Sequence, residues 1–396
     1  MTALKDLMNR FDCDTLVAEG APSASSPLCN SYGDLRANYL MNDSIVGVED
    51  CDLLLLVGTN PRFEAPVLNA RIRKAFIHYD LRAALVGSEC DLKYDYDYLG
   101  PSSGVLDQLA DGKHPYSKVL QEAKRPMVLV GSSVAEDPDG ASVLLAAQRL
   151  SEALRSKLTD ATGEWRVFNV LQRYASQVAA LDLGYRVGTP PTPSKGPYEL
   201  VYLLGADENA LRAIDLAEDA FVVYQGHHGE SGAEIADVIL PGAAYTEKEA
   251  TYANTEGRAQ QAYSAVSPPG QARVDWKVLR ALSEIALVTL PYDTLQDLRR
   301  RMTEIAPNLT HYGSVEKSDL LELALKANTR SVKQRSGRQP SKDLHMRETE
   351  LWQFYQSNNI IARASPTMAR CVEAAKRHER NLYLDPPQRH AKIAAL

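Results

Sequence analysis

The run CDLLLLVG, residues 51–58, is the stretch of sequence that decides the fold class. Its apolar part is far shorter than the roughly 20 residues that a membrane-spanning helix needs, and it has the length of a strand. Because every residue from 53 to 57 is apolar, we expect both faces of this strand to be covered, as in parallel sheets. The run therefore predicts a central strand of an α/β domain.

Further apolar runs also end in glycine, and stretches with helical periodicity lie between them. The runs are RAALVG (82–87), RPMVLVG (125–131) and ELVYLLG (199–205), and the helical stretches include APVLNARIRKAF (65–76) and GASVLLAAQRLSEALRSKL (140–158). This alternation predicts mostly parallel sheets with flanking crossover helices. A glycine after such a strand suits either a plain turn or an approach to the crevice in which open α/β sheets bind ligands.

The loops after the strands lack the spacing of phosphate-binding loops. Neither VGTNPRFEAP (57–66) nor LGADENA (204–210) contains G-x-G-x-x-G, and the chain has no G-x-x-x-x-G-K-[ST] motif. The sequence therefore argues against nucleotide binding.

Length and charge limit the class of function. With 396 residues and 44% hydrophobic residues, the chain is long enough for two or three packed units. A net charge of -7 gives no electrostatic reason to bind nucleic acid or an anionic membrane surface. No apolar run is long enough to span a bilayer. We expect protein partners, no nucleic acid and no direct membrane span.

The cysteines are scattered, at Cys13, Cys29, Cys51, Cys90 and Cys371. Structural zinc and iron-sulfur sites use close pairs such as C-x-x-C, and no such pair occurs. Free thiols are favoured over a cluster built from distant cysteines, so we expect no metal and no cofactor in this chain.

The densest group of polar side chains lies in YQGHHGESGAEIADVILPGAAYTEKEATYANTEGRAQ, residues 224–260. Adjacent His227 and His228 point to opposite faces of an extended backbone and converge only in a loop, so ordinary hydrogen bonding is favoured over a metal site. The acids Glu247, Glu249 and Glu256 suit either acid/base chemistry or ion pairs. Nothing in the sequence shows a pocket that would raise a carboxyl pKa, so ion pairs are favoured and no catalytic residue is expected.

Composition divides the chain into three regions. The Pro- and Gly-rich stretch 181–200 marks a boundary, which gives a first α/β part at 1–190 and a second at 191–290. A helical and extended docking region follows at 291–396. Within it, the basic residues of 326–347 predict either a solvated connector, which is favoured, or a basic docking segment.

The last stretch regains apolar anchors. Trp352, Phe354 and Tyr355 are aromatic residues of the kind enriched in interface cores, and a helix start signal follows near Ser365 or Thr367. We expect these three residues, together with Arg363, to dock onto a partner or onto the parent domain.

One motif resembles a known family. The strand DVILP (237–241) ends at a Pro-Gly turn, and E-x-x-A-T-Y-x-N-T-E-G-R-A-Q follows at 247–260. This segment resembles the molybdopterin-dependent oxidoreductases, such as formate dehydrogenases, and the large iron-sulfur subunit of respiratory complex I. Further stretches resemble the mitochondrial (75-kDa) version of that subunit, at 3–16, 54–76, 175–188, 275–295 and 362–376.

The resemblance implies a doubly wound α/β fold without the cofactor chemistry of the enzymes. In the family, an amino-terminal part carries iron-sulfur clusters on closely spaced Cys and His. Those motifs are absent here, so the chain resembles the carboxyl-terminal portion, as a cut fragment or as one half of a naturally split subunit, which we favour. Cys29 is either a structural thiol, which we favour, or a molybdenum ligand.

Three functions follow as hypotheses. The first is a non-catalytic structural portion of complex I, in the peripheral matrix arm of the mitochondrial inner-membrane complex, supporting electron transfer from NADH to ubiquinone. Its partners would be other peripheral-arm subunits, including a chain that bears the iron-sulfur clusters. The second is a fragment of an active molybdopterin oxidoreductase such as formate dehydrogenase, and the third is a free-standing binding protein.

Overall fold

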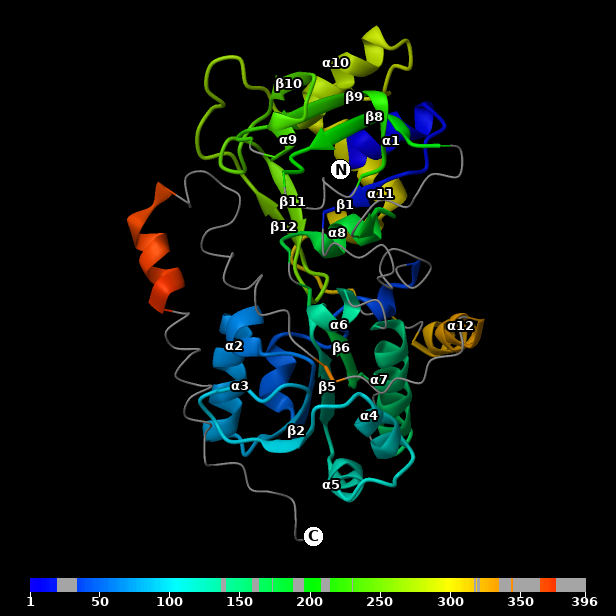
Figure 1. The fold of residues 1–396 in the computed structure, drawn as a ribbon, viewed down its shortest axis with the longest axis vertical. Coiled ribbons are helices and arrows are strands. Elements are labelled where there is room, and N and C mark those ends of the chain that lie inside the picture. Colours follow the sequence, from blue (N-terminus) through cyan, green and yellow to red (C-terminus); the bar gives the residue numbers. More distant parts are fainter. Residues whose placement is uncertain are drawn as a thin grey trace. The chain divides into compact units, whose positions relative to one another are not determined.

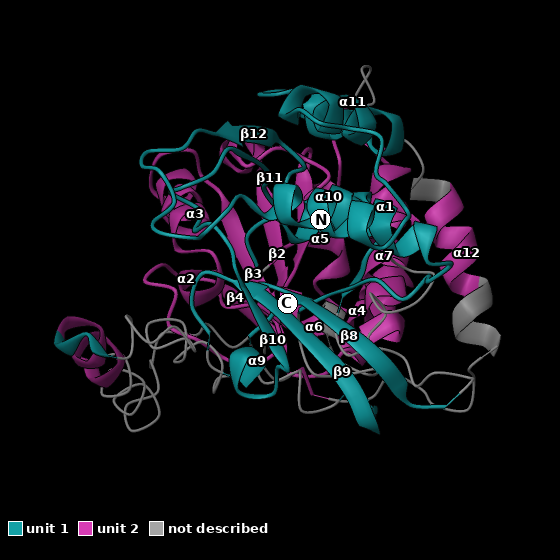
Figure 2. Ribbon diagram, turned by 90° about the horizontal axis from the view of Figure 1, so that it is seen from above, with its two compact units in different colours: residues 1–24, 174–316, 356–366 teal, residues 25–173, 317–355, 367–396 magenta. Residues whose placement is uncertain are grey.

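The computed structural model of the chain describes most of its first 316 residues and parts of the remainder. The described residues are 1–19, 34–136, 140–158, 164–172, 174–187, 196–207, 214–229, 231–316, 318, 321–334, 343–344 and 364–374. They belong to two compact units, shown in different colours in Figure 2. Unit 1 comprises residues 1–24, 174–316 and 356–366, and unit 2 comprises residues 25–173, 317–355 and 367–396. The division into 1–190, 191–290 and 291–396 stays a prediction about domains.

Unit 2 is built on a five-stranded, all-parallel sheet with the strand order β4-β3-β2-β5-β6. The strands are β2 (Leu53–Val57), β3 (Arg82–Val86), β4 (Asp97–Gly100), β5 (Pro126–Val130) and β6 (Phe168–Val170). Every residue of β2 and β5 is buried, which confirms that the run at 51–58 forms a central strand covered on both faces.

Crossover helices cover both faces of this sheet. Figure 1 shows α3 and α7 on opposite sides of it, and α3 contributes Leu68 and Ile72 to the core. The helices of unit 2 are α2 (Pro61–Glu64), α3 (Pro66–His78), α4 (Gly104–Ala110), α5 (Ser117–Glu122), α6 (Ser132–Glu136), α7 (Gly140–Arg155) and α12 (Leu321–Gln334), with short 3-10 helices at Arg36–Asn38 and Val46–Asp50. The doubly wound α/β fold with flanking helices is thus confirmed.

Helix α12 corrects the prediction for the first part of the basic stretch at 326–347, of which 335–342 and 345–347 lie outside the described residues. Residues 326–334 continue a helix rather than forming an extended connector. Asn328 anchors it, because its amide donates to Asn38 Oδ1 at 3.1 Å and to Gln148 Oε1 at 2.8 Å, while Gln148 donates to Asn38 at 2.7 Å. Among the side chains of this helix that the structure describes, the buried ones are Ala324 and Asn328, which is why its composition resembled a solvated segment.

Unit 1 contains a smaller parallel sheet with the order β10-β9-β8. Its strands are β8 (Tyr198–Leu204), β9 (Leu216–Gly226) and β10 (Val238–Pro241), so the predicted strands at 199–205 and 237–241 are confirmed. One face carries the buried cluster of Leu203, Val222 and Tyr224. Two further pairs of strands are β1 (Val17–Ala18) with β7 (Arg186–Val187), and β11 (Ala250–Ala253) with β12 (Ala259–Ala262).

Helices from both ends of unit 1 pack together. They are α1 (Thr2–Arg10), α8 (Gln177–Asp182), α9 (Ser231–Glu234), α10 (Asp275–Ile285) and α11 (Leu295–Ile305), followed by a 3-10 helix at Pro307–Thr310. Arg301 of α11 holds buried Asp6 of α1 through its Nε and Nη2, at 3.0–3.2 Å. Among the described helices of the chain, none combines the length and hydropathy that a bilayer span requires.

Candidate functional site

The strand order of the unit 2 sheet reverses between β2 and β5. The chain runs outward from β2 through β3 to β4 and then returns to place β5 on the other side of β2. In open α/β sheets, ligands bind outside the carboxyl ends of the two strands at such a switch point. Here those ends are Val57 with Gly58 and Val130 with Gly131, and Gly131 N donates to the carbonyl of Val57 at 3.0 Å.

The carboxylate of Glu64 fills this switch point. Oε1 accepts a hydrogen bond from the backbone N–H of Ser132 at 2.5 Å, and Oε2 accepts one from the hydroxyl of Thr59. Thr59 and Ser132 are 2% and 4% exposed. The donors that follow β2 and β5 are therefore used by an acidic side chain of the chain itself.

A second internal segment crosses the same edge of the sheet. The carbonyl of Leu344 accepts hydrogen bonds from the N–H and the hydroxyl of Ser88, both at 3.2 Å, and Leu344 N donates to Pro101 O at 2.8 Å. Gly58 has φ +56, and a Cβ there would lie 2.5 Å from Val134 Cγ2 and 3.7 Å from Leu344 Cβ. The space beyond β2 is thus packed by side chains.

These residues do not fit a phosphate-bearing cofactor such as a pterin. Phosphate needs free N–H donors or cations, whereas the Ser132 N–H already faces a carboxylate, which would repel a second anion. Gly131 is also crowded, because a Cβ there would lie 2.5 Å from the carbonyl oxygen of Gly58. The switch point therefore has the packing of a filled crevice.

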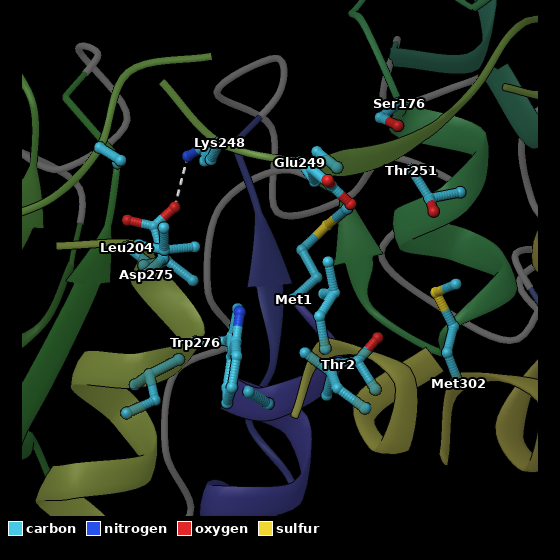
Figure 3. A pocket seen from close by; sticks show the side chains of 18 of the residues that line it. Met1, Thr2, Ser176, Leu204, Lys248, Glu249, Thr251, Asp275, Trp276 and Met302 are labelled. Carbon is cyan, nitrogen blue, oxygen red and sulfur yellow. Dashed lines mark hydrogen bonds and ion pairs between the residues drawn. The ribbon is translucent and has the colours of Figure 1, made fainter. Parts of the chain in front are cut away.

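A cavity of about 340 Å³ lies within unit 1 (Figure 3). It is bounded by the start of α1, the ends of β8 and β9, and helices α10 and α11. Most of its walls are apolar, with Leu204, Trp276, Leu279, Leu298 and Met302 among them.

The charged side chains at this cavity are paired with one another. Lys248 forms an ion pair with Asp275, drawn as a dashed line in Figure 3, and Arg299 lies 3.2 Å from Glu249. The buried amide of Gln225 donates to Asp275 Oδ1 at 3.1 Å and accepts from the hydroxyl of Tyr202. Because the charges neutralise each other, the cavity offers apolar surface with a compensated polar rim.

The predicted polar patch at 224–260 is a set of separate structural contacts. His227 and His228 lie in the turn after β9, and their ring centroids are 5.1 Å apart. The two side chains therefore converge, as expected for a loop rather than for an extended strand. Glu249 pairs with Arg299, and Glu247 accepts from the N–H of Ala244 at 3.0 Å. Each of these two acids thus holds a structural contact.

Glu256 forms an ion pair, the role favoured for it from the sequence, and its partner is Arg258. Arg258 Nε donates to Glu256 Oε1 at 2.8 Å, and the carboxylate is 4% exposed whereas the arginine side chain is 35% exposed. The Arg258 side chain also donates to the carbonyl of Gly313. The backbone N–H of Arg258 donates to Asn254 Oδ1 at 2.9 Å. The pair closes the loop between β11 and β12.

Cys51 and Cys90 have the character of protonated thiols. Burial raises the pKa of Cys51 well above its usual range, and the thiol donates to the carbonyl of Leu53 at 3.0 Å. Burial, reinforced by Asp91, raises the pKa of Cys90 to about 12. Within the described part of the chain, no group of three or more His, Cys, Asp or Glu side chains is placed to hold a metal ion.

The predicted docking residues Trp352, Phe354, Tyr355 and Arg363 lie outside the described residues, as does Cys29. Their roles stay predictions. The helix expected near Ser365 or Thr367 is present at residues 366–374.

Sequence reasoning missed Glu64 and the Lys248–Asp275 pair. A signal for Glu64 was present, because NPRFE places an acid just beyond the glycine that ends β2, where a phosphate site would exclude it. The Lys248–Asp275 pair carries no local signal, since its members are far apart in sequence.

Comparison with known proteins agrees with this architecture. The family model described as Molybdopterin oxidoreductase matches residues 1–285. The chain is 43% identical over 376 residues to the mitochondrial NADH-ubiquinone oxidoreductase 78 kDa subunit of Neurospora crassa, covering 95% of this chain and 48% of the relative. It is 40% identical over 390 residues to the NADH-ubiquinone oxidoreductase 75 kDa subunit of Reclinomonas americana, covering 94% of this chain and 53% of the relative.

A third relative is the mitochondrial NADH dehydrogenase [ubiquinone] iron-sulfur protein 1 of Solanum tuberosum, 44% identical over 309 residues, which cover 78% of this chain and 40% of the relative. The chain thus spans about half the length of the relatives it matches. Since the family match extends over most of the sequence, the chain belongs to the molybdopterin oxidoreductase family, and its similarity to NADH-ubiquinone oxidoreductase subunits extends over about 95% of its length.

Proposed function

We propose that the chain is a non-catalytic structural portion of the large iron-sulfur subunit of NADH:ubiquinone oxidoreductase, complex I. Its place would be the peripheral arm, on the matrix side of the mitochondrial inner membrane, where it supports electron transfer from NADH to ubiquinone by the assembled complex. The names of the relatives support this assignment, since each is a subunit of that enzyme.

The observation that carries the non-catalytic part is the position of Glu64. An acid that uses the donors at the switch point leaves no room for an anionic cofactor in that crevice. In unit 1, the paired charges at the cavity likewise leave no unpaired Lys or Arg side chain among the described lining residues to hold a phosphate.

We further propose that the iron-sulfur clusters lie on polypeptide outside this sequence, either a further segment of the same polypeptide or the partner chain of a split subunit. The relatives are about twice as long as the matched region, and this chain has no closely spaced cysteines. An immunoblot of the organism's mitochondria tests the split directly. A band at the chain mass of 43.6 kDa supports it, and a band near twice that mass contradicts it.

Native gel electrophoresis of gently solubilised mitochondria tests the assignment to complex I. The tagged full-length chain should migrate with the band that stains for NADH dehydrogenase activity, together with other peripheral-arm subunits. Migration of the whole population as a free protein would refute the proposal. Removal of residues 351–396 should weaken this association if Trp352, Phe354, Tyr355 and Arg363 dock onto a partner.

A second candidate is a fragment of an active molybdopterin oxidoreductase. The family match over residues 1–285 favours it, since this family includes enzymes of that type. Elemental analysis of the purified assembly separates the two candidates. Stoichiometric molybdenum or tungsten that co-purifies with the chain would favour the enzyme, and its absence from an assembly active with NADH would favour the structural role.

A further inference from the structure

The small sheet of unit 1 has one covered face and one open face. In a parallel sheet, residues paired across strands project to the same side. Leu203 and Tyr224 are paired in the register and belong to the buried cluster on the first face. Their neighbours one position away project to the second face, in the rows Leu200 with Phe221, Tyr202 with Val223 and Val238, and Leu204 with Gln225 and Leu240.

The second face is apolar and partly exposed to solvent. Leu200 is 57% exposed, Phe221 is 46% exposed and Val238 is 37% exposed. These three residues come from three adjacent strands, so their side chains form one surface, which we call the open face. Tyr202 and Val223, in the same row as Val238, are only partly buried.

Such exposure is unusual for an all-parallel sheet. Parallel sheets occur almost only where layers cover both faces, and the sheet of unit 2 follows this rule, with every residue of β2 and β5 buried. In unit 1, by contrast, Leu200 and Phe221 are exposed, whereas their neighbours Val201 and Val222 on the first face are partly and fully buried. The described part of unit 1 therefore lacks a layer over this end of the open face.

The open face continues into the apolar cavity of unit 1. Leu204 and Gln225 form the last row of this face, and both line the cavity next to Trp276. Through Leu204 and Gln225 the open face thus adjoins the cavity, which the starts of α1 and α10 also bound. A surface of this form suits a packed polypeptide layer with at least one side chain that enters the cavity.

We propose that the open face is the docking surface for the polypeptide that corresponds to the half of the relatives that this chain does not match. This chain covers 48% of the Neurospora protein and 53% of the Reclinomonas protein, so the unmatched part is 52% of the first and 47% of the second. A part of this size is large enough to supply the layer. The inference rests on the proposed function, because it takes the two halves to act together in one subunit. The inference adds to the proposed function the surface through which the two halves join.

Site-specific photo-crosslinking identifies the occupant. Benzoylphenylalanine replaces Phe221 in the tagged full-length chain, the respiratory assembly is purified through the tag and irradiated, and the adduct is sequenced by mass spectrometry. The expected adduct is a peptide similar to the unmatched half of the relatives. A peptide from a second copy of this chain or from any other protein overturns the proposal, as does no adduct from an assembly that contains the unmatched half.

Tyr79, which is 50% exposed at the end of α3 in unit 2, is the matched control position and should give no such adduct. The same preparation separates this proposal from the broader one. If the chain enters the respiratory complex but the probe at Phe221 crosslinks to another polypeptide, only the assignment of the docking surface is wrong. If the chain enters no such complex, the proposed function itself fails.

A paired substitution gives an independent test. Leu200→Thr with Phe221→Thr places β-branched residues, which suit strands, but removes apolar contact area, so the recovery of the unmatched half with the chain should fall at least about tenfold. The control is Ile77→Thr with Tyr79→Thr, two residues of similar exposure, 54% and 50%, which should leave recovery unchanged. Equal recovery with both pairs, from chains with unchanged thermal unfolding, overturns the proposal.

Discussion

The carboxylate of Glu64 accepts the backbone N–H of Ser132 at 2.5 Å, across the carboxyl ends of β2 and β5. This contact joins residues that are 68 positions apart in sequence. It places an acid where ligands of doubly wound sheets bind, and the first prediction follows from it.

We expect Glu64→Ala to lower the free energy of unfolding by about 1–3 kcal/mol, because Ser132 N–H and the Thr59 hydroxyl lose a buried acceptor. Glu64→Gln keeps one acceptor and should cost less. The matched control is Glu122→Ala at the exposed end of α5, expected within about 0.5 kcal/mol of wild type. Chemical denaturation of the purified chain measures all three, and equal stability of Glu64→Ala and wild type would show that the contact is not formed.

The Glu256–Arg258 pair leads to a second prediction. Arg258→Ala leaves a buried carboxylate without its cation, but Arg258 is about one-third exposed and bonds Glu256 through one nitrogen, so we expect a loss of about 1–3 kcal/mol rather than the full cost of breaking a buried pair. Arg273→Ala, at an exposed arginine of the same unit, is the control. A thermal shift for Arg258→Ala no larger than that of the control would contradict the structural role of the pair.

Asn328 tests whether α12 is an integral helix of unit 2. Asn328→Ala removes two hydrogen bonds and leaves Asn38 and Gln148 partly unsatisfied, so stability should fall by about 1–3 kcal/mol and α12 should become more sensitive to limited proteolysis. Lys326→Ala, on the exposed side of the same helix, should change neither the stability nor the sensitivity to proteolysis. Equal digestion of the two variants would restore the interpretation of this stretch as a solvated connector.

Cys90 gives a prediction about thiol chemistry. With its pKa raised to about 12, about one molecule in ten thousand carries the thiolate at pH 8, so alkylation by iodoacetamide should be slow in the folded chain. The rate should rise as pH increases towards 12 and should recover its ordinary value when the chain is unfolded in guanidinium. Rapid alkylation of folded Cys90 at pH 8 would contradict the assignment.

The sequence predicted the parts of the fold that are determined locally. The apolar runs that became β2, β3 and β5 carry their own signal, because a strand buried on both faces is apolar throughout. The family motif at 247–260 likewise indicated the fold from local residues.

Other features depend on contacts that sequence spacing does not show. Leu344 meets Ser88 across 256 residues, and Asn328 meets Asn38 across 290 residues, so neither contact follows from local pattern. Helix α12 was misjudged for this reason, since its anchor is a polar side chain whose partners are distant. The open face of the unit 1 sheet also required the register of β8, β9 and β10, which shows that Leu200, Phe221 and Val238 share one side.

The most direct test of the account is the NADH:ubiquinone oxidoreductase activity per assembled complex, measured in mitochondria depleted of the endogenous chain and complemented with wild type, Glu64→Ala, Arg258→Ala or Asn328→Ala. A structural role predicts that depletion removes the assembled complex, and that each variant lowers the amount of complex while the activity of every assembled complex stays at the wild-type value. Normal assembly without the chain, or a variant that assembles in full but turns over more slowly, would contradict the proposal that this chain supports electron transfer without taking part in the chemistry.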